Sequence, residues 1–230
     1  MQVDGIPVTT EAFPRTVRLV TTARLRAPVL MPLVDSEDEL ALLGEIEGAT
    51  SARLMAQERG ISGLAANELV YDVPHAHFIN ACFAYAKPQQ PNRFNGANRG
   101  AWYAALALQT CLAEVGFHLT KALSDAGDFN ATVEYAEMFC SLAGDFIDLR
   151  QRPQHPSLGA DIATAYPLGN ALAESARAEG LNGIIYPSVR HPDGTCLVAL
   201  RPAAVQSVRQ GDVYRMIWRG RPEPIIEGPL

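Results

Sequence analysis

Three residues of the sequence, Arg93, Tyr103 and Glu114, have side chains that could act together on a charged small molecule. An arginine offers a fixed fork of donors to a phosphate, and a tyrosine offers a flat ring for stacking. A carboxylate can offset positive charge that develops in a transition state. Each residue alone has a commoner explanation, as a surface charge, a core aromatic and an exposed or ion-paired acid. Only their order and flanking residues make them candidates for one site.

Two predicted elements would position part of this set. A short strand is expected at 101–104, and a helix rich in Ala and Leu at about 105–123 holds Glu114 near its middle. On that helix Thr110, Glu114 and His118 share one face at i, i+4 spacing. A carboxylate on a helix otherwise suited to burial needs a partner or a purpose.

The rest of the chain mixes helices and strands without the regular alternation of a doubly wound sheet. Further strands are expected at 16–20, 132–139, 146–149, 183–187, 196–200 and 213–218, and further helices from 36, at 51–60, at 78–86 and at 167–180. We therefore predict one α+β domain over 1–230. Packed sheets and flanking helices would form its core at about 75–220, after a mainly helical N-terminal extension at about 1–74.

Composition limits the classes of function. Of 230 residues 48% are hydrophobic and 19% charged, as in ordinary soluble proteins. The net charge is −6 without a Lys/Arg block, so direct nucleic-acid binding is not expected. The sequence shows no apolar run of membrane-spanning length and no export signal, which predicts a cytoplasmic protein without membrane contact. The four cysteines lie far apart and His75 and His77 have no further ligands in pattern, so no metal is expected.

The ordered motifs resemble those of the RES domain, a family named for its Arg, Glu and Ser. The stretches that match its first motifs are 93–95, 100–105 and 110–114. The stretches that look like its terminal segment, which holds the Ser, are 171–180, 183–190 and 196–202. The resemblance covers about 93–218, and the Ser corresponds to Ser188. Each motif alone is common, but the ordered combination is specific.

The resemblance implies an ADP-ribosyltransferase-like fold that binds NAD⁺ as a substrate, without a metal. NAD⁺ already carries a good leaving group, so the enzyme mainly has to hold the dinucleotide and stabilise a ribosyl cation. Glu114 would stabilise that cation, Arg93 would bind the pyrophosphate and Tyr103 would stack on the nicotinamide, and these three form the predicted catalytic set. Ser188 would position the ligand or Glu114.

Further contacts to NAD⁺ are implied with less detail. The run at 17–20 resembles the segment with the family's early arginine, which makes Arg18 a candidate contact and leaves Arg53 as its rival. Asn95 and Arg190 are additional candidates. The sequence has no G-x-G-x-x-G motif, so redox use of NAD is not expected.

The function that the resemblance implies is that of a toxin from a toxin–antitoxin pair, which cleaves the bond between nicotinamide and ribose. Its partner would be a helix-turn-helix antitoxin whose C-terminal region plugs the cleft, in a hetero-oligomer. The acceptor of ADP-ribose stays open between water, phosphate and a protein side chain, and the last would make the chain an ADP-ribosyltransferase of a housekeeping metabolic enzyme.

Two other classes of function fit the sequence less well. A catalytically silent regulatory module has no chemical need for Arg93, Tyr103, Glu114 and Ser188 together. A serine hydrolase that uses Ser188 would need a histidine base in a recognisable motif or a G-x-S-x-G elbow, and the sequence has neither.

Overall fold

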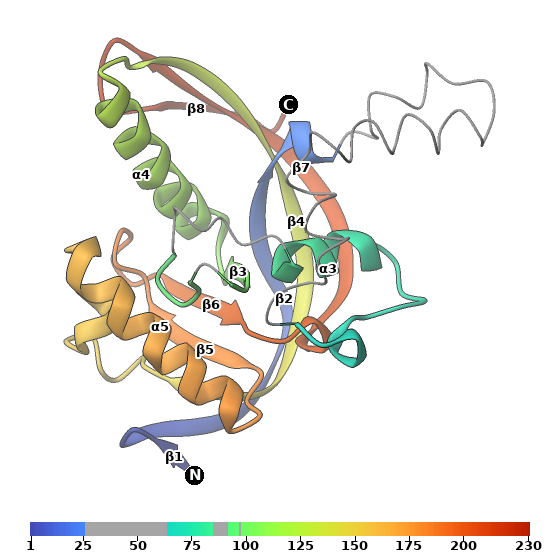
Figure 1. The fold of residues 1–230 in the computed structure, drawn as a ribbon. Helices are drawn as coiled ribbons and strands as arrows, with labels where there is room; N and C mark the ends of the chain where they lie inside the picture. The colour runs from blue at the N-terminus through green and yellow to red at the C-terminus, as the bar shows by residue number, and fades with distance from the viewer. Residues whose placement is uncertain (26–63, 85–91, 97) are drawn as a thin grey trace.

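The computed structural model describes residues 1–25, 64–84, 92–96 and 98–230 (Figure 1). The helices expected from 36 and at 51–60, and Arg53 with them, lie outside these residues. The strands are β1 (Gln2–Val3), β2 (Ile6–Thr21), β3 (Trp102–Ala105), β4 (Asn130–Asp148), β5 (Gly183–Pro187), β6 (Thr195–Ala199), β7 (Val205–Arg219) and β8 (Ile225–Glu227). The helices are α3 (Ala76–Ala84), α4 (Leu108–Ala126) and α5 (Ile162–Ala178), and short 3-10 turns span Thr22–Arg24, Ala66–Glu68, Pro156–Leu158 and Pro202–Ala204.

All eight strands join one sheet in the order β1-β2-β3-β6-β5-β4-β7-β8. Because β4 also pairs with β2, the strands β2, β3, β6, β5 and β4 form a closed ring of paired strands. The pairing of β4 with β5 is parallel, and the other pairings are antiparallel. The ring is weakest where β2 meets β3, since only Val17 and Ala105 pair there. The mixture of helices and strands confirms the α+β prediction, but the strands form one large sheet and not the packed sheets that were expected.

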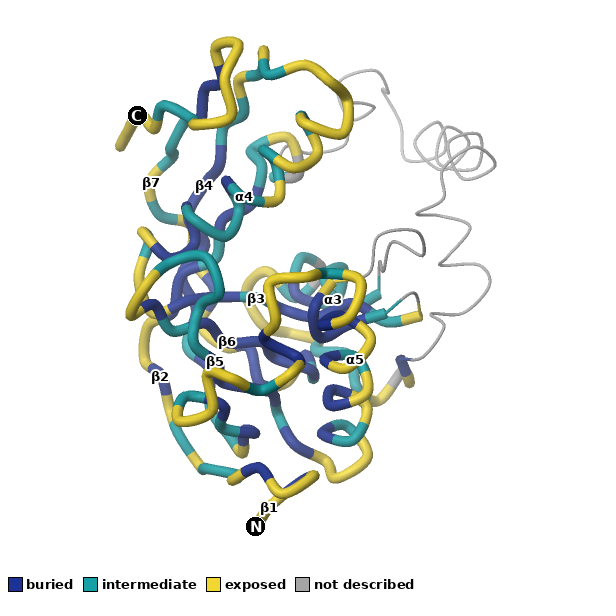
Figure 2. Tube along the Cα trace, turned by 90° about the vertical axis from the view of Figure 1, so that its left-hand side faces the viewer, coloured by how far each residue is buried: buried dark blue, intermediate teal, exposed yellow. Residues whose placement is uncertain are grey.

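Helices cover the long strands from two sides. Helices α4 and α5 lie on one side of β2, β4 and β7, and α3 lies on the other (Figure 1). Two buried clusters match this arrangement, because α4 and α5 contribute to one and Ile79 and Phe83 of α3 to the other. Buried residues concentrate on β3, β6 and the inner face of α5, whereas the loops are exposed (Figure 2). Among the described residues, no helix is long and apolar enough to cross a membrane.

The N-terminal segment differs from the expected helical extension. Residues 6–21 form β2, which pairs with β4 along most of its length and belongs to the core sheet. The short strand predicted at 16–20 is therefore part of a much longer one. Pro14 lies where the register with β4 shifts, between Phe13 and Thr16. A bulge tolerates a proline because its residue need not donate a ladder hydrogen bond.

Other boundaries also differ from the sequence prediction, and the strand expected at 213–218 is the end of the longer strand β7. The strands expected at 132–139 and 146–149 are one continuous strand, β4, in which Gly144 adopts a φ of +133°. Helix α5 begins at Ile162 and not at Pro167, because the Asp161 side chain accepts a hydrogen bond from the amide of Ala163. Such an N-cap sets the start of a helix more strongly than a proline further along.

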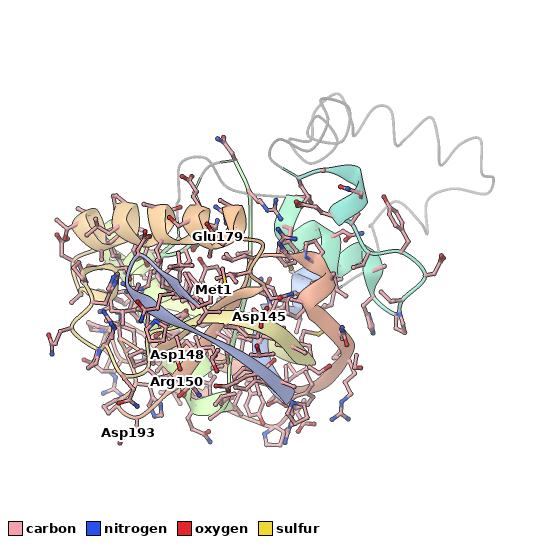
Figure 3. All side chains as sticks on the ribbon, turned by 90° about the horizontal axis from the view of Figure 1, so that it is seen from below. Met1, Asp145, Asp148, Arg150, Glu179 and Asp193 are labelled. Carbon is pink, nitrogen blue, oxygen red and sulfur yellow. The ribbon has the colours of Figure 1, made fainter. Side chains whose placement is uncertain are left out.

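Charged side chains tie β2 to the end of β4. Arg150 Nη2 donates to Asp148 Oδ2 at 2.7 Å and also contacts the carboxylate of Glu11 on β2. Asp148 and Arg150 lie side by side just before the loop that leads to α5 (Figure 3). These ion pairs help to fix the start of that loop.

Candidate active site

A cavity of about 220 Å³ opens between α4 and α5, above strands β2, β3, β5 and β6. The side chains that matter for chemistry in its wall are Arg18, Arg93, Tyr103, Glu114, Tyr166 and Tyr186. Glu114 is the single carboxylate among the described residues that line it. The described part of the chain also contains no group of three or more His, Cys, Asp or Glu that could hold a metal ion.

The side chain of Glu114 is oriented by Ser188, whose hydroxyl uses its proton and both of its acceptor sites in hydrogen bonds. Ser188 Oγ donates to Glu114 Oε1 at 2.6 Å and accepts from the amides of Arg190 at 3.1 Å and His191 at 3.0 Å. A hydroxyl has one proton and two acceptor sites. Since both acceptor sites are filled by backbone amides, the proton points to the carboxylate. Ser188 therefore orients Glu114, and its hydroxyl has no histidine base.

Helix α4 presents a second titratable group, His118, to the same cavity, one turn after Glu114. Desolvation lowers the pKa of His118, and the charges of Arg190 and Arg93 lower it further, whereas Glu114 raises it. The net effect keeps the ring neutral at neutral pH, because the ordinary pKa is already about 6.5.

Arg93 is buried, with 7% of its surface exposed, and its anchors are backbone atoms. Its Nη1 donates to the carbonyl oxygens of Ser157 and Gly159, and the centre of its guanidinium lies 5.2 Å from the centroid of the Tyr166 ring. Within the described residues no carboxylate lies within ion-pair distance of Arg93. A buried charge needs compensation, so this arginine is suited to an anionic ligand.

Helix α5 packs closely against the segment that contains Arg93. Asn170 Nδ2 donates to the carbonyl oxygen of Asn92 at 2.9 Å. A Cβ added at Gly169 would lie 2.1 Å from the carbonyl oxygen of Arg93, so only glycine allows this approach. The close packing explains why a helix interior contains a glycine at this point.

Tyr103 is fixed at its hydroxyl. It donates to Asn95 Oδ1 at 2.9 Å and accepts from the amide of Phe94 at 3.0 Å. Burial raises the pKa of Tyr103 above its ordinary value, so the phenol stays protonated. Asn95 is 3% exposed and contacts Tyr103 instead of lining the cavity.

Arg18 reaches the cavity from β2. Its Nη1 donates to the carbonyl oxygen of Tyr103 at 3.3 Å, and its guanidinium centre lies 4.8 Å from the centroid of the Trp102 ring. Its Nε is buried without a hydrogen-bond partner among the described residues. An unsatisfied charged donor in a cavity wall fits a site for a polar, anionic ligand.

Two thiols complete the wall near Glu114. Cys196 Sγ lies 3.9 Å from Glu114 Oε1, and Cys111 Sγ donates to the carbonyl oxygen of Val17 at 3.0 Å. Burial raises the pKa of Cys111 to about 12 and also raises the pKa of Cys196. Both are neutral thiols at neutral pH, which suits packing and not nucleophilic attack.

The structure brings the predicted residues together, although they do not all line the cavity. Arg18, Arg93, Tyr103 and Glu114 line it, Ser188 and Asn95 contact two of these four, and Arg190 packs on Phe117 with its guanidinium 3.5 Å from the ring centroid. The sequence analysis missed Tyr166 and Tyr186 in the wall and the bond between His191 and Thr110. Tyr186 could have been found because it is two residues before Ser188, whereas no local signal marks Tyr166.

Comparisons with known proteins agree with the motif-based interpretation. The RES domain family model matches residues 69–219. The chain is 27% identical over 189 residues to Uncharacterized protein y4oC of Sinorhizobium fredii. The aligned region covers 80% of this chain and 75% of that protein. In the crystal structure of the M. tuberculosis MbcT–MbcA toxin–antitoxin complex, one chain aligns with a TM-score of 0.39 and 14% identity, over 55% of this chain and 72% of that chain. The family model matches well over half of this chain, and the chain therefore belongs to the RES domain family.

Proposed function

We propose that the chain binds NAD⁺ and cleaves the bond between nicotinamide and ribose. The observation that carries this proposal is that Glu114 is the one carboxylate among the described residues of a cavity wall that also contains two arginines. Hydrolysis of an ordinary glycoside uses two carboxyl groups, because one of them must protonate the leaving group. Nicotinamide is cationic while it is attached and leaves as a neutral molecule, so it needs no such proton. One carboxylate beside the ribose is then sufficient.

The charged and aromatic side chains at the cavity have distinct tasks in this reaction. The two electrons of the C1′–N bond leave with nicotinamide, and the positive charge that this bond break leaves on the ribosyl carbon is offset by Glu114. Ser188 holds the carboxylate through its 2.6 Å hydrogen bond. The guanidinium groups of Arg93 and Arg18 suit the two negative charges of the pyrophosphate. Tyr103 or Tyr166 offers a ring on which nicotinamide can stack.

The size of the cavity limits which part of the substrate it holds. Sites for whole drug-sized ligands span roughly 300–1,000 Å³, and this cavity measures about 220 Å³. We therefore assign it to the nicotinamide, its ribose and the adjoining pyrophosphate, with the adenosine end outside the described wall.

The experiment incubates purified protein with NAD⁺ and measures free nicotinamide, with and without EDTA. The wild-type chain is expected to release nicotinamide in both conditions, whereas Glu114→Gln is expected to release almost none. Parallel reactions in water alone, with phosphate and with a protein lysate identify the acceptor as free ADP-ribose, a phosphorylated product or a labelled protein. No release under any of these conditions, or release that EDTA abolishes, would refute the proposal.

We also propose that this activity makes the chain the toxin of a toxin–antitoxin pair. Its acidic net charge of −6 fits a division of labour in which a helix-turn-helix antitoxin binds the DNA and plugs the cavity. Expression of the wild-type chain alone is expected to stop growth, and expression of Glu114→Gln is not. Growth that stops equally with both variants would contradict NAD⁺ consumption as the cause.

A further inference from the structure

The serine that holds Glu114 belongs to a tight turn at residues 188–194. The amide of Ser188 donates to the carbonyl oxygen of Gly194 at 2.7 Å, and the amide of Gly194 donates to that of His191 at 3.1 Å. The amides of Arg190 and His191 point at Ser188 Oγ. The turn is therefore closed internally, but nothing inside it fixes its orientation relative to Glu114.

The turn joins the paired strands β5 and β6, and beyond that attachment it makes three contacts with one face of α4. Ser188 bonds Glu114, His191 Nδ1 bonds Thr110 Oγ1 at 3.0 Å, and the Arg190 guanidinium stacks 3.5 Å from the ring centroid of Phe117. The three helix positions, 110, 114 and 117, follow the i, i+4, i+7 pattern of a single face. The turn thus lies along the helix, and Glu114 is the middle contact of three.

The contact at Thr110 is the most enclosed of the three. Thr110 is 1% exposed. A Cβ added at Gly194 would lie 2.8 Å from Thr110 Oγ1 and 2.9 Å from His191 Nδ1, so the turn approaches the helix as closely as glycine permits. Glu114 lies one helical turn further on, so a shift of the turn at Thr110 would displace Ser188 as well.

We propose that Thr110 and His191 are positioning residues for the nicotinamide-releasing reaction. This inference rests on the function proposed above. Their hydrogen bond holds the turn against α4, and the docked turn points the Ser188 proton at Glu114 Oε1. Neither residue contacts the substrate. Loss of the bond leaves Ser188 bonded to its own turn but lets the carboxylate leave the orientation in which it offsets the ribosyl charge.

The test compares threonine variants on the same helix. Thr110→Val removes the hydroxyl at nearly constant volume, and Thr110→Ser restores it. Thr120→Val is the matched control, because Thr120 Oγ1 also makes two hydrogen bonds, to Pro222 and Trp218, at the other end of α4. We expect Thr110→Val to lower kcat about tenfold with KM for NAD⁺ unchanged, Thr110→Ser to recover most of that loss, and Thr120→Val to keep the wild-type kcat.

A double-mutant cycle shows whether the effect passes through Ser188. In a Ser188→Ala background, Thr110→Val is expected to cause no further loss of kcat, because the proton that it helps to direct is already absent. Independent losses that multiply, a change in KM instead of kcat, or a Thr110→Val rate equal to that of Thr120→Val would each overturn the inference.

A readout without turnover separates this inference from the proposed function. The amides of Arg190 and His191 are expected to exchange with deuterium faster in Thr110→Val than in Thr120→Val, because the docked turn protects them. If wild-type protein released no nicotinamide, the proposed function would fail whatever the exchange rates. If wild-type protein were active and the exchange rates were equal, the positioning role alone would fail.

Discussion

The two walls of the cavity hold their charged residues in different ways. On the α5 side, Arg93 is fixed by backbone groups, namely the carbonyl oxygens of Ser157 and Gly159 and the close approach of Gly169. On the α4 side, Glu114 is fixed by a side chain, the hydroxyl of Ser188. The α5 side, which we call the arginine wall, therefore depends on how the main chain packs. The α4 side, which we call the acid wall, depends on hydrogen bonds that a mutation can remove one at a time.

The difference suits the charges that each wall would meet. A pyrophosphate is negative in the free substrate, in the complex and in the transition state, so a rigid arginine is useful throughout. Charge at the ribosyl carbon develops only as nicotinamide leaves. An acid that must be complementary to that transient charge needs an accurate orientation more than a deep anchor.

The largest expected effect is on the acid wall. Glu114→Gln keeps the shape and the contact with Ser188 but removes the charge, so kcat should fall by about 10²–10³-fold, roughly 3–4 kcal/mol of transition-state stabilisation. NAD⁺ affinity should stay close to that of the wild type, because the lost interaction belongs to the transition state. Calorimetric titration and nicotinamide release measure the two quantities. Turnover close to that of the wild type would show that the carboxylate is only structural.

The arginine wall should respond in the opposite order. Arg93→Ala removes an interaction that is present before and during the reaction, so the affinity for NAD⁺ should fall first. It also leaves the carbonyl oxygens of Ser157 and Gly159 without their donor, which should lower the melting temperature. A variant that binds NAD⁺ normally but turns over slowly would remove the distinction between the walls.

A pair of glycines tests the packing side of the comparison. Gly169→Ala on α5 should lower the free energy of unfolding by about 2–3 kcal/mol, since its Cβ would meet the Arg93 backbone at 2.1 Å. Gly116→Ala on α4 is the matched control, because its Cβ would meet the flexible end of Met216 at 3.0 Å and Pro224 Cγ at an ordinary contact distance of 3.9 Å. It should change stability by no more than about 1 kcal/mol, with helix propensity in its favour. Chemical denaturation measures both, and equal losses would contradict the proposed grip of α5 on Arg93.

The same contrast explains what could be predicted from the sequence. The i, i+4 spacing of Glu114 and His118 predicts that they share a helix face, and both line the same cavity. The strand at 183–187 was also placed correctly, since it is short, apolar and bounded by Gly183 and Pro187. Patterns of this kind can be recognised from neighbouring residues in the sequence.

Contacts between residues that are far apart in the sequence leave no such local pattern. Gly169 is the point where α5 meets the Arg93 backbone, and no local pattern around it in the sequence indicates that contact. The short strand expected at 16–20 is part of a strand of sixteen residues, in which the shift in register between β2 and β4 accommodates Pro14. The partner of each residue is remote in the sequence, so composition and periodicity could not reveal it.

A smaller effect is expected at the edge of the arginine wall. Arg18→Gln removes the charged Nε that is buried without a hydrogen-bond partner among the described residues, so NAD⁺ affinity should fall about tenfold with kcat little changed. Arg15→Gln on the same strand is the matched control, because Arg15 is exposed and its guanidinium lies over Phe139, outside the cavity wall. Titration of both variants with NAD⁺ measures the difference. Equal affinities would mean that the substrate does not reach Arg18.

The smallest effect concerns pH and the acid wall. Desolvation lowers the pKa of His118, so the ring is neutral at pH 7 and takes up a proton only below its ordinary pKa of about 6.5. The proton would place a positive charge one helical turn from Glu114, where it opposes the carboxylate's stabilisation of the ribosyl cation.

We expect kcat of the wild type to fall by an additional factor of roughly two on the acid side, relative to His118→Gln, whose side chain stays neutral. The two pH profiles of kcat are compared as a ratio, so that groups titrating in both enzymes cancel. The lowered pKa also means that protonation favours the unfolded chain, so this contribution to stability is present above about 6.5 and is lost as the pH falls below it. A ratio that stays constant from pH 5 to 8 would show that His118 does not influence the charge at Glu114.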